Sequence, residues 1–333
     1  MLTERLIAAG VAAAVRASDN QAMHLIVPFA SAQADAAHAM LPTLAMPTLD
    51  RLLATWGEVQ RDAGDDDSLS MPHQRALAAA LGWTAPDGAL PWAARQAALD
   101  GLNVGRTAWG ELTPVHWRVG SDGIHMLDPT ALALTEPDSR ALLAAVQPLF
   151  ASEGYDLRWG APLRWYAAHP SLQGLATASI ERVIGRNSNR WLPRQPAAKG
   201  LRRLQNEVQM LLHTHPLNDA REAAGALPVN SFWLSGCGAL QPDQAHDAGV
   251  DARLRGPALQ GDWAVWGQSW QALDAEALVP LMAAAERGEP VRLTLCGERG
   301  SVTLAPQARP WWRRMIESLS PAPPRARALL ESL

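Results

Sequence analysis

Apolar residues along this chain follow two spacings, and segments with one spacing alternate with segments that have the other. Alternating positions or short apolar runs predict strands at 23–31, 109–119, 123–129, 155–159, 163–169, 229–238, 262–267 and 291–304. Three-and-four spacing predicts helices at 1–20, in short pieces over 36–59, at 71–83, 137–149, 201–212, 216–225 and 272–287, and at the end of 321–333. This alternation favours an α/β fold with a mixed sheet flanked by helices and a smaller β-rich subregion.

The same pattern suggests where the chain divides. We expect an N-terminal α/β part over 23–107, a β-rich subregion over 108–195 and a C-terminal α/β part over 196–333, with no long Ser-, Gly- or Pro-rich linker between them. The segment 1–22 precedes the first strand, and we expect it to be a non-native extension with Met23 as the native start. The acidic GDDDS at 64–68 is expected to be a solvated turn.

Composition narrows the class of protein. A chain of 333 residues with 48% hydrophobic content buries a large core. No run of 18 apolar residues occurs and the formal net charge is −4, so we expect a cytoplasmic protein that does not contact a membrane and is an improbable nucleic-acid binder. Cys237 and Cys296 share no CxxC-type spacing, which predicts reduced thiols.

Several standard sites are missing from the sequence. The one lysine, Lys199, stands outside a GxxxxGK[ST] frame, and no GxSxG, HExxH or strand-to-helix GxGxxG occurs, so we predict no cofactor and no metal. The 14 tryptophans are expected mostly in the core, with partners for their ring N–H groups. The alternative is a base-stacking platform, for which Trp311-Trp312 beside Arg313-Arg314 is the candidate.

Polar residues are densest between residues 206 and 231. Asn218 and Arg221 lie three apart on a short predicted helix, and Asn230 opens the next strand, an arrangement able to hold a carboxylate or a phosphate. The alternative is that these groups brace helix to sheet. The candidate ligand-binding residues are Asn206, Glu207, His215, Asn218, Arg221, Asn230 and Ser231.

Histidines and cysteines add weaker candidates. His213 and His215 are two residues apart with no third ligand at a defined spacing, which disfavours a metal site. His116 and His125 could approach across a hairpin, and satisfied core histidines are the favoured interpretation. Cys237 has no identifiable base or helix N-terminus to activate it.

The most basic stretch of the chain is 182–203. Guanidinium groups match phosphate oxygens, so this stretch predicts an anion site, with a solvated Arg-rich surface as the alternative. A third interpretation, contact with nucleic acid, is disfavoured by the acidic net charge. The candidate anion contacts are Arg186, Arg194, Arg202 and Arg203.

Three strings carry a resemblance to a known family. RRLQNEVQMLLHTHPLNDAREAAGALPVNSFWLSGCG (202–238), MHLIVPFAS (23–31) and TPVHW (113–117) resemble those of the bacterial RpfE-type regulatory proteins, which are often labelled cofactor-independent phosphoglycerate mutase. The order of His215, Asn218, Arg221 and Asn230 is similar to a stretch of the archaeal-type mutases. The resemblance covers most of the chain from Met23 onward and implies a degenerate phosphatase-like α/β scaffold.

Those mutases belong to the alkaline-phosphatase-like superfamily, which uses two divalent ions held by Asp and His and a Ser or Thr that becomes phosphorylated. Here the strand that would deliver the first metal-binding Asp reads HLIVPFAS, without a carboxylate, and His246-Asp247 is a poor substitute for the other ligands. The resemblance therefore implies a pseudoenzyme: a regulatory protein, non-catalytic, with a pocket for a small anion or for an acidic group of a protein partner. The alternatives are a metal-dependent phosphoglycerate mutase-like phosphotransfer enzyme and, third, a nucleic-acid-associated factor.

Overall fold

The structure is a computed structural model that describes residues 23–121, 123–244, 248–307 and 325–333. The chain forms two compact units, each interrupted along the sequence. Within the described residues, unit 1 comprises 23–67, 71–82, 243–244, 248–307 and 325–333, and unit 2 comprises 68–70, 83–121 and 123–242. This division differs from the three consecutive parts expected above, because segments from both halves of the sequence build unit 1. The segment 1–22, His246-Asp247 and the stretch Trp311 to Arg314 lie outside the described residues.

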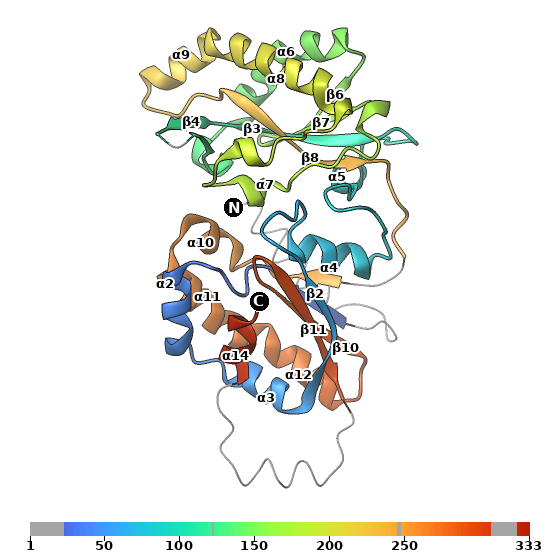
Figure 1. The fold of residues 1–333 in the computed structure, drawn as a ribbon, viewed down its shortest axis with the longest axis vertical. Helices are drawn as coiled ribbons and strands as arrows, with labels where there is room; N and C mark the ends of the chain where they lie inside the picture. Colours follow the sequence, from blue (N-terminus) through green and yellow to red (C-terminus); the bar gives the residue numbers. More distant parts are fainter. Residues whose placement is uncertain (1–22, 122, 245–247, 308–324) are drawn as a thin grey trace. The chain divides into compact units, whose positions relative to one another are not determined.

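A five-stranded mixed sheet with the strand order β2-β11-β10-β1-β9 forms the centre of unit 1 (Figure 1). Strand β1 (Met23–Val27) runs parallel to β10 (Val291–Cys296) on one side and to β9 (Ala248–Val250) on the other. Strands β11 (Gly300–Pro306) and β2 (Trp56–Ala63) extend the sheet antiparallel to their neighbours. The strand expected at 23–31 and the hairpin expected at 291–304 are confirmed.

One face of this sheet is apolar and carries the core of unit 1. Alternate residues of β10 and β11, among them Leu293, Leu295 and Val302, are fully buried there. The covering helices are α2 (Asp35–Met40), α3 (Pro47–Thr55), α10 (Arg255–Gln260), α11 (Trp263–Glu276), α12 (Leu278–Glu286) and α14 (Arg325–Glu331).

The strand expected at 262–267 is wrong, because this segment begins helix α11. The Asp262 carboxylate accepts a hydrogen bond from the Val265 N–H at 3.0 Å and caps the helix. Trp266 and Trp270 lie four residues apart, so the helix buries both on one side. The helix expected at 272–287 is divided between α11 and α12, which meet at Ala277.

Unit 2 is built on an antiparallel sheet with the order β6-β7-β3-β8. Its strands are β3 (Trp109–Val115), β6 (Asp156–Ala161), β7 (Arg164–Ala168) and β8 (Ser231–Gly238), with a separate hairpin of β4 (Trp117–Gly120) and β5 (Gly123–Met126). Its helices are α5 (Trp92–Leu99), α6 (Glu136–Ser152), α7 (Ile180–Val183), α8 (Lys199–His213) and α9 (Pro216–Ala223). The helices expected at 137–149, 201–212 and 216–225 are confirmed.

Strand β2 was not predicted, and its first residues contradict the helical pieces expected up to residue 59. It is an edge strand that pairs only with β11, and Glu58, Gln60 and Arg61 on it are exposed. An edge strand with polar side chains on both faces lacks the alternation by which buried strands are detected. Tertiary pairing, and not local pattern, makes this segment a strand.

Several buried tryptophans find the expected partners. The ring N–H groups of Trp109, Trp165 and Trp233 each donate at 2.9 Å, to the Val104 carbonyl, the Ser139 hydroxyl and the Ala178 carbonyl. Those of Trp83, Trp92 and Trp117 are buried without a hydrogen-bond partner among the described residues.

Both cysteines, Cys237 and Cys296, are buried free thiols, as expected. Over the ranges that the structure describes, no helix has the length and apolarity needed to cross a bilayer.

Candidate functional site

The polar cluster expected around residues 206–231 is, at its centre, a structural brace. The Asn218 amide donates to the carbonyls of Leu212 and Val229 at 2.8 Å each and accepts from the Val229 N–H at 2.9 Å. The Asn230 side chain likewise exchanges two hydrogen bonds with the backbone of Trp117, at 2.7 and 2.8 Å. Their partners are the Leu212 carbonyl in the last turn of α8, the backbone of Val229 just before β8 and the backbone of Trp117 at the start of β4.

Arg221 completes this brace. Its guanidinium donates to the carbonyls of Leu227 and Leu132 and lies 3.5 Å from the Asp138 carboxylate. The side chain is only 8% exposed. We call Asn218, Arg221 and Asn230 the brace; their hydrogen bonds match the structural alternative stated above, and ligand binding by them stays a prediction.

The remaining side chains of the cluster contact different partners and do not form one site. His215 accepts from the Leu217 N–H at the start of α9, and the Ser231 hydroxyl accepts from the Gln209 amide at 3.2 Å. Asn206 is exposed, and Glu207 pairs with Arg203 at 3.5 Å. A small pocket of unit 2, lined by Arg202, Gln205 and Trp233 among others, includes none of these side chains.

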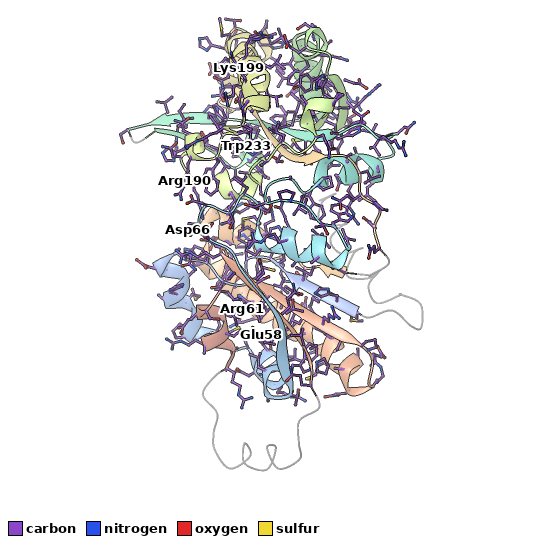
Figure 2. The ribbon with its side chains drawn as sticks, turned by 45° about the vertical axis from the view of Figure 1, so that its right-hand side comes forward. Glu58, Arg61, Asp66, Arg190, Lys199 and Trp233 are labelled. Atoms are coloured by element: carbon purple, nitrogen blue, oxygen red, sulfur yellow. The ribbon has the colours of Figure 1, made fainter. Side chains whose placement is uncertain are left out.

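The candidate anion contacts of the basic stretch do not converge either. Arg202 donates to the Pro193 carbonyl at 2.7 Å, and Arg203 pairs with Glu153. Arg194 is exposed and Arg186 is half-buried. Figure 2 marks Lys199, which lies at the start of α8, and Arg190, whose guanidinium lies 5.5 Å from the Trp191 ring.

The end of β1, where the resemblance places a metal-binding Asp, is closed by tryptophans. The ring N–H groups of Trp266 and Trp270 donate to the carbonyls of Phe29 and Ala30 at 2.9 and 3.1 Å. Phe29 adopts a φ of 55°, a conformation costly for a bulky residue and held here by burial. The described residues contain no group of three or more His, Cys, Asp or Glu side chains placed to hold a metal.

A pocket of about 390 Å³ lies instead over the second, polar face of the sheet of unit 1. Side chains alternate across a strand, so the positions between the buried leucines of β10 and β11 all project to this face. Helix α4 (Pro72–Ala80) packs against β1, β10 and β11 and forms the other wall. We call this cavity the pocket; its lining residues are His24, Gln60, Asp62, Arg75, Ala76, Ala79, Ala80, Arg292, Ser301 and Thr303.

A chain of hydrogen bonds runs across the floor of the pocket. The His24 ring contacts the Thr294 hydroxyl at 2.7 Å, and that hydroxyl contacts the Thr303 hydroxyl at 2.8 Å. Thr294 is fully buried, whereas His24 and Thr303 line the cavity. Thr294 and Thr303 lie opposite one another in the β10–β11 register, whereas the residue opposite His24 is Arg292, so the His24 ring reaches Thr294 diagonally.

An ion pair closes one end of the pocket. The Arg75 guanidinium on α4 lies 2.7 Å from the Asp62 carboxylate on β2 and donates to the Arg299 carbonyl at 3.1 Å. This pair fastens the helix to the edge of the sheet. Arg292 is the other cation in the lining; it is exposed and makes no ion pair or side-chain hydrogen bond with any residue that the structure describes.

Glu111 of unit 2 is a carboxylic acid with little exposure, and it belongs to neither the brace nor the pocket. Glu111 on β3 lies opposite Tyr166 of β7 and accepts from the Thr113 hydroxyl at 3.4 Å. Burial raises the pKa of the Glu111 carboxyl to about 7; the charge of Arg164 opposes this rise and that of Asp100 adds to it. Burial likewise raises the pKa of the Cys237 thiol to about 12, so this thiol is a poor nucleophile, as the sequence suggested.

The sequence analysis missed the pocket, although a signal for it exists. Residues 291–296 and 301–304 alternate between apolar and polar, as in Val291-Arg292-Leu293-Thr294, and His24 is the polar residue of an apolar strand. Such alternation marks a sheet with one solvated or polar face. The pattern does not reveal that α4 covers this face and leaves a cavity.

Solved structures that are similar to this chain include the following two. One is the cofactor-independent phosphoglycerate mutase from Thermoplasma acidophilum, with 13% identity and a TM-score of 0.35 over 85% of this chain and 88% of that chain. The other is the PH0037 protein from Pyrococcus horikoshii, with 10% identity and a TM-score of 0.45 over 87% of this chain and 88% of that chain. No protein-family model matches the chain, and no curated protein matches it by sequence. These values are too low to transfer a residue or an activity, and membership of the RpfE-type group stays a prediction.

Proposed function

We propose that this chain is a non-catalytic binding protein and that the pocket of unit 1 holds a small anion. The observation that carries the proposal is Arg292, a guanidinium at the pocket without a protein partner among the described residues. It lies opposite His24 in the sheet, and the hydroxyls of Ser301 and Thr303 belong to the same lining. An arginine with uncommitted donors next to hydroxyl groups is the chemistry that recognises carboxylate and phosphate groups.

The floor of the pocket supports binding over covalent chemistry. The hydroxyl that His24 contacts belongs to Thr294, which is fully buried and does not line the cavity. A nucleophile must touch both its base and the substrate. His24 therefore acts in this proposal as a positioned polar wall and not as the base of an activated hydroxyl.

The test is a thermal-unfolding titration of the full chain with acetate and with sulfate, against chloride at equal ionic strength. A ligand that binds only the folded state raises the midpoint in proportion to its concentration over Kd. We expect one of the anions to raise it, Arg292→Gln to abolish the rise, and Arg194→Gln, in the basic stretch of unit 2, to leave it unchanged.

Loss of the effect in Arg194→Gln and not in Arg292→Gln would move the site to the basic stretch. The absence of any anion effect would refute the proposal. The regulatory role and the phosphotransfer alternative have a separate test: turnover of 3-phosphoglycerate with added manganese would contradict a non-catalytic function.

A further inference from the structure

The charge balance of the pocket limits the charge of its ligand. Two arginines, Arg75 and Arg292, stand against one carboxylate, Asp62, so the lining carries one net positive charge when His24 is neutral. A monoanion balances this charge. Arg75 and Asp62 neutralise each other, so a dianion on Arg292 would leave one negative charge unbalanced, which disfavours it.

The surrounding backbone also disfavours a dianion. Phosphate groups are typically held at helix N-termini, where backbone N–H groups and the positive end of the helix dipole meet the ligand. The pocket is lined instead by the second half of α4, with Ala79 and Ala80 at the end of the helix. The negative end of the dipole lies there, and it repels added negative charge.

The wall opposite the polar strands is apolar. Ala76, Ala79 and Ala80 share one side of α4, as residues three and four apart do, and they face the cavity. Their methyl groups offer no hydrogen bond. A ligand that fills the pocket therefore needs a polar end toward Arg292 and a hydrocarbon part toward the alanines, as is usual for small-molecule sites.

We infer that the ligand of the pocket is a short-chain monocarboxylate, with its carboxylate on Arg292 and its hydrocarbon chain along the alanine wall of α4. This inference rests on the proposed function and names the ligand class of the same site. The protein itself contains the corresponding interaction, because the Asp62 carboxylate is bound by Arg75 at the closed end of the cavity.

Isothermal titration calorimetry on the full chain at pH 8 tests this inference with four probes. Hexanoate, hexyl phosphate and 1-hexanol share a six-carbon chain, and acetate keeps the carboxylate without that chain. At this pH the phosphate monoester is a dianion, since its second pKa is about 6. We expect hexanoate to bind at least tenfold more tightly than each of the other three. Arg292→Gln should weaken hexanoate at least tenfold and leave hexanol unchanged.

A matched control is Arg61→Gln. Arg61 lies on the same edge strand as Asp62 but projects to the other face, where it pairs with Glu58 at 2.7 Å, and Figure 2 labels both residues on β2. Hexanoate affinity should not change in this variant.

The outcomes separate the two proposals. If hexyl phosphate binds as tightly as hexanoate, the monocarboxylate inference is overturned and anion binding stands. Equal affinity for hexanol and hexanoate would show that Arg292 does not recognise charge and would contradict both proposals. If acetate matches hexanoate, the alanine wall plays no part and the hydrocarbon half of the inference fails.

Discussion

The molecule has two polar regions, the brace of unit 2 and the pocket of unit 1. Their side chains are of similar types but contact different partners. In the brace, Asn218, Arg221 and Asn230 direct their donors to backbone carbonyls. In the pocket, His24 and Arg292 line a cavity, and Arg292 has no protein partner among the described residues. Density of polar residues in the sequence marked the first region and not the second.

The difference follows from how the backbone is satisfied in each place. The brace lies where a helix ends and a loop returns to the sheet, so carbonyls such as those of Leu227 and Val229 stand outside the hydrogen bonds of helix and strand. The pocket lies over a sheet in which the strands already pair with one another. On that face His24, Thr294 and Thr303 contact one another, and Arg292 makes no hydrogen bond or ion pair with any other side chain that the structure describes.

The largest expected effect comes from breaking the brace. Asn218→Ala removes three hydrogen bonds and takes the partner from the N–H and the carbonyl of Val229, while the Leu212 carbonyl keeps the His215 N–H. Since each such group costs 1–3 kcal/mol, we expect a loss of about 3 kcal/mol in the local stability of unit 2. Amide hydrogen exchange of β8 in the full chain measures it.

The matched control for this prediction is Asn206→Ala on the exposed side of α8, which should change the exchange of β8 by less than about 0.5 kcal/mol. Equal effects of the two substitutions would show that the amide of Asn218 is not a structural brace. If Asn218→Ala keeps the stability of the parent, Asn218 would again be a candidate for ligand binding.

Glu111 sharpens the comparison, because it is a polar group of unit 2 that is buried with little hydrogen bonding. Its pKa in the folded state, about 7, lies above its ordinary value, so the folded state holds a proton that the unfolded chain has released. The stabilising contribution is therefore complete below about pH 4.5 and is lost as the pH rises to about 7.

In Glu111→Gln this contribution to the pH dependence should disappear. Because the Glu111 side chain keeps part of its contact with solvent, we expect the variant to be more stable than the parent by about 2 kcal/mol above pH 7, less than the full shift would give. Urea denaturation of the full chain between pH 4.5 and 8 checks this. An unchanged slope would mean that Glu111 ionises freely in the folded protein.

The smallest effect is expected at the floor of the pocket. Thr294→Val keeps the shape of the side chain but removes the hydroxyl that joins His24 to Thr303. We expect the local stability of β10, measured by amide hydrogen exchange, to fall by about 1 kcal/mol. The loss is small because the two former partners, His24 and Thr303, line the cavity. A loss as large as that of Asn218→Ala would make the floor a second brace.

The spacing of apolar residues predicted most helices and strands whose apolar side packs into the core. The amphipathic α8, the short α9 and the hairpin of β10 and β11 appear where the spacing of apolar residues places them. The prediction was wrong at 262–267, since a run of apolar residues has the same composition in a buried strand and in the first turns of a buried helix. Only the cap at Asp262 and the spacing of Trp266 and Trp270 distinguish them.

The sequence by itself determined the class of fold, the reduced state of both cysteines and the place of the brace, because these depend on local spacing, on residue type and on neighbours close along the chain. Tertiary structure alone decided the pocket. Its residues come from positions near 24, 60, 75, 292 and 302, and they meet because β1 pairs in parallel with β10 across more than half the chain. Local alternation tells which face of a strand is polar, whereas the partner strand, and therefore the neighbour of each polar group, is set by packing of the whole unit.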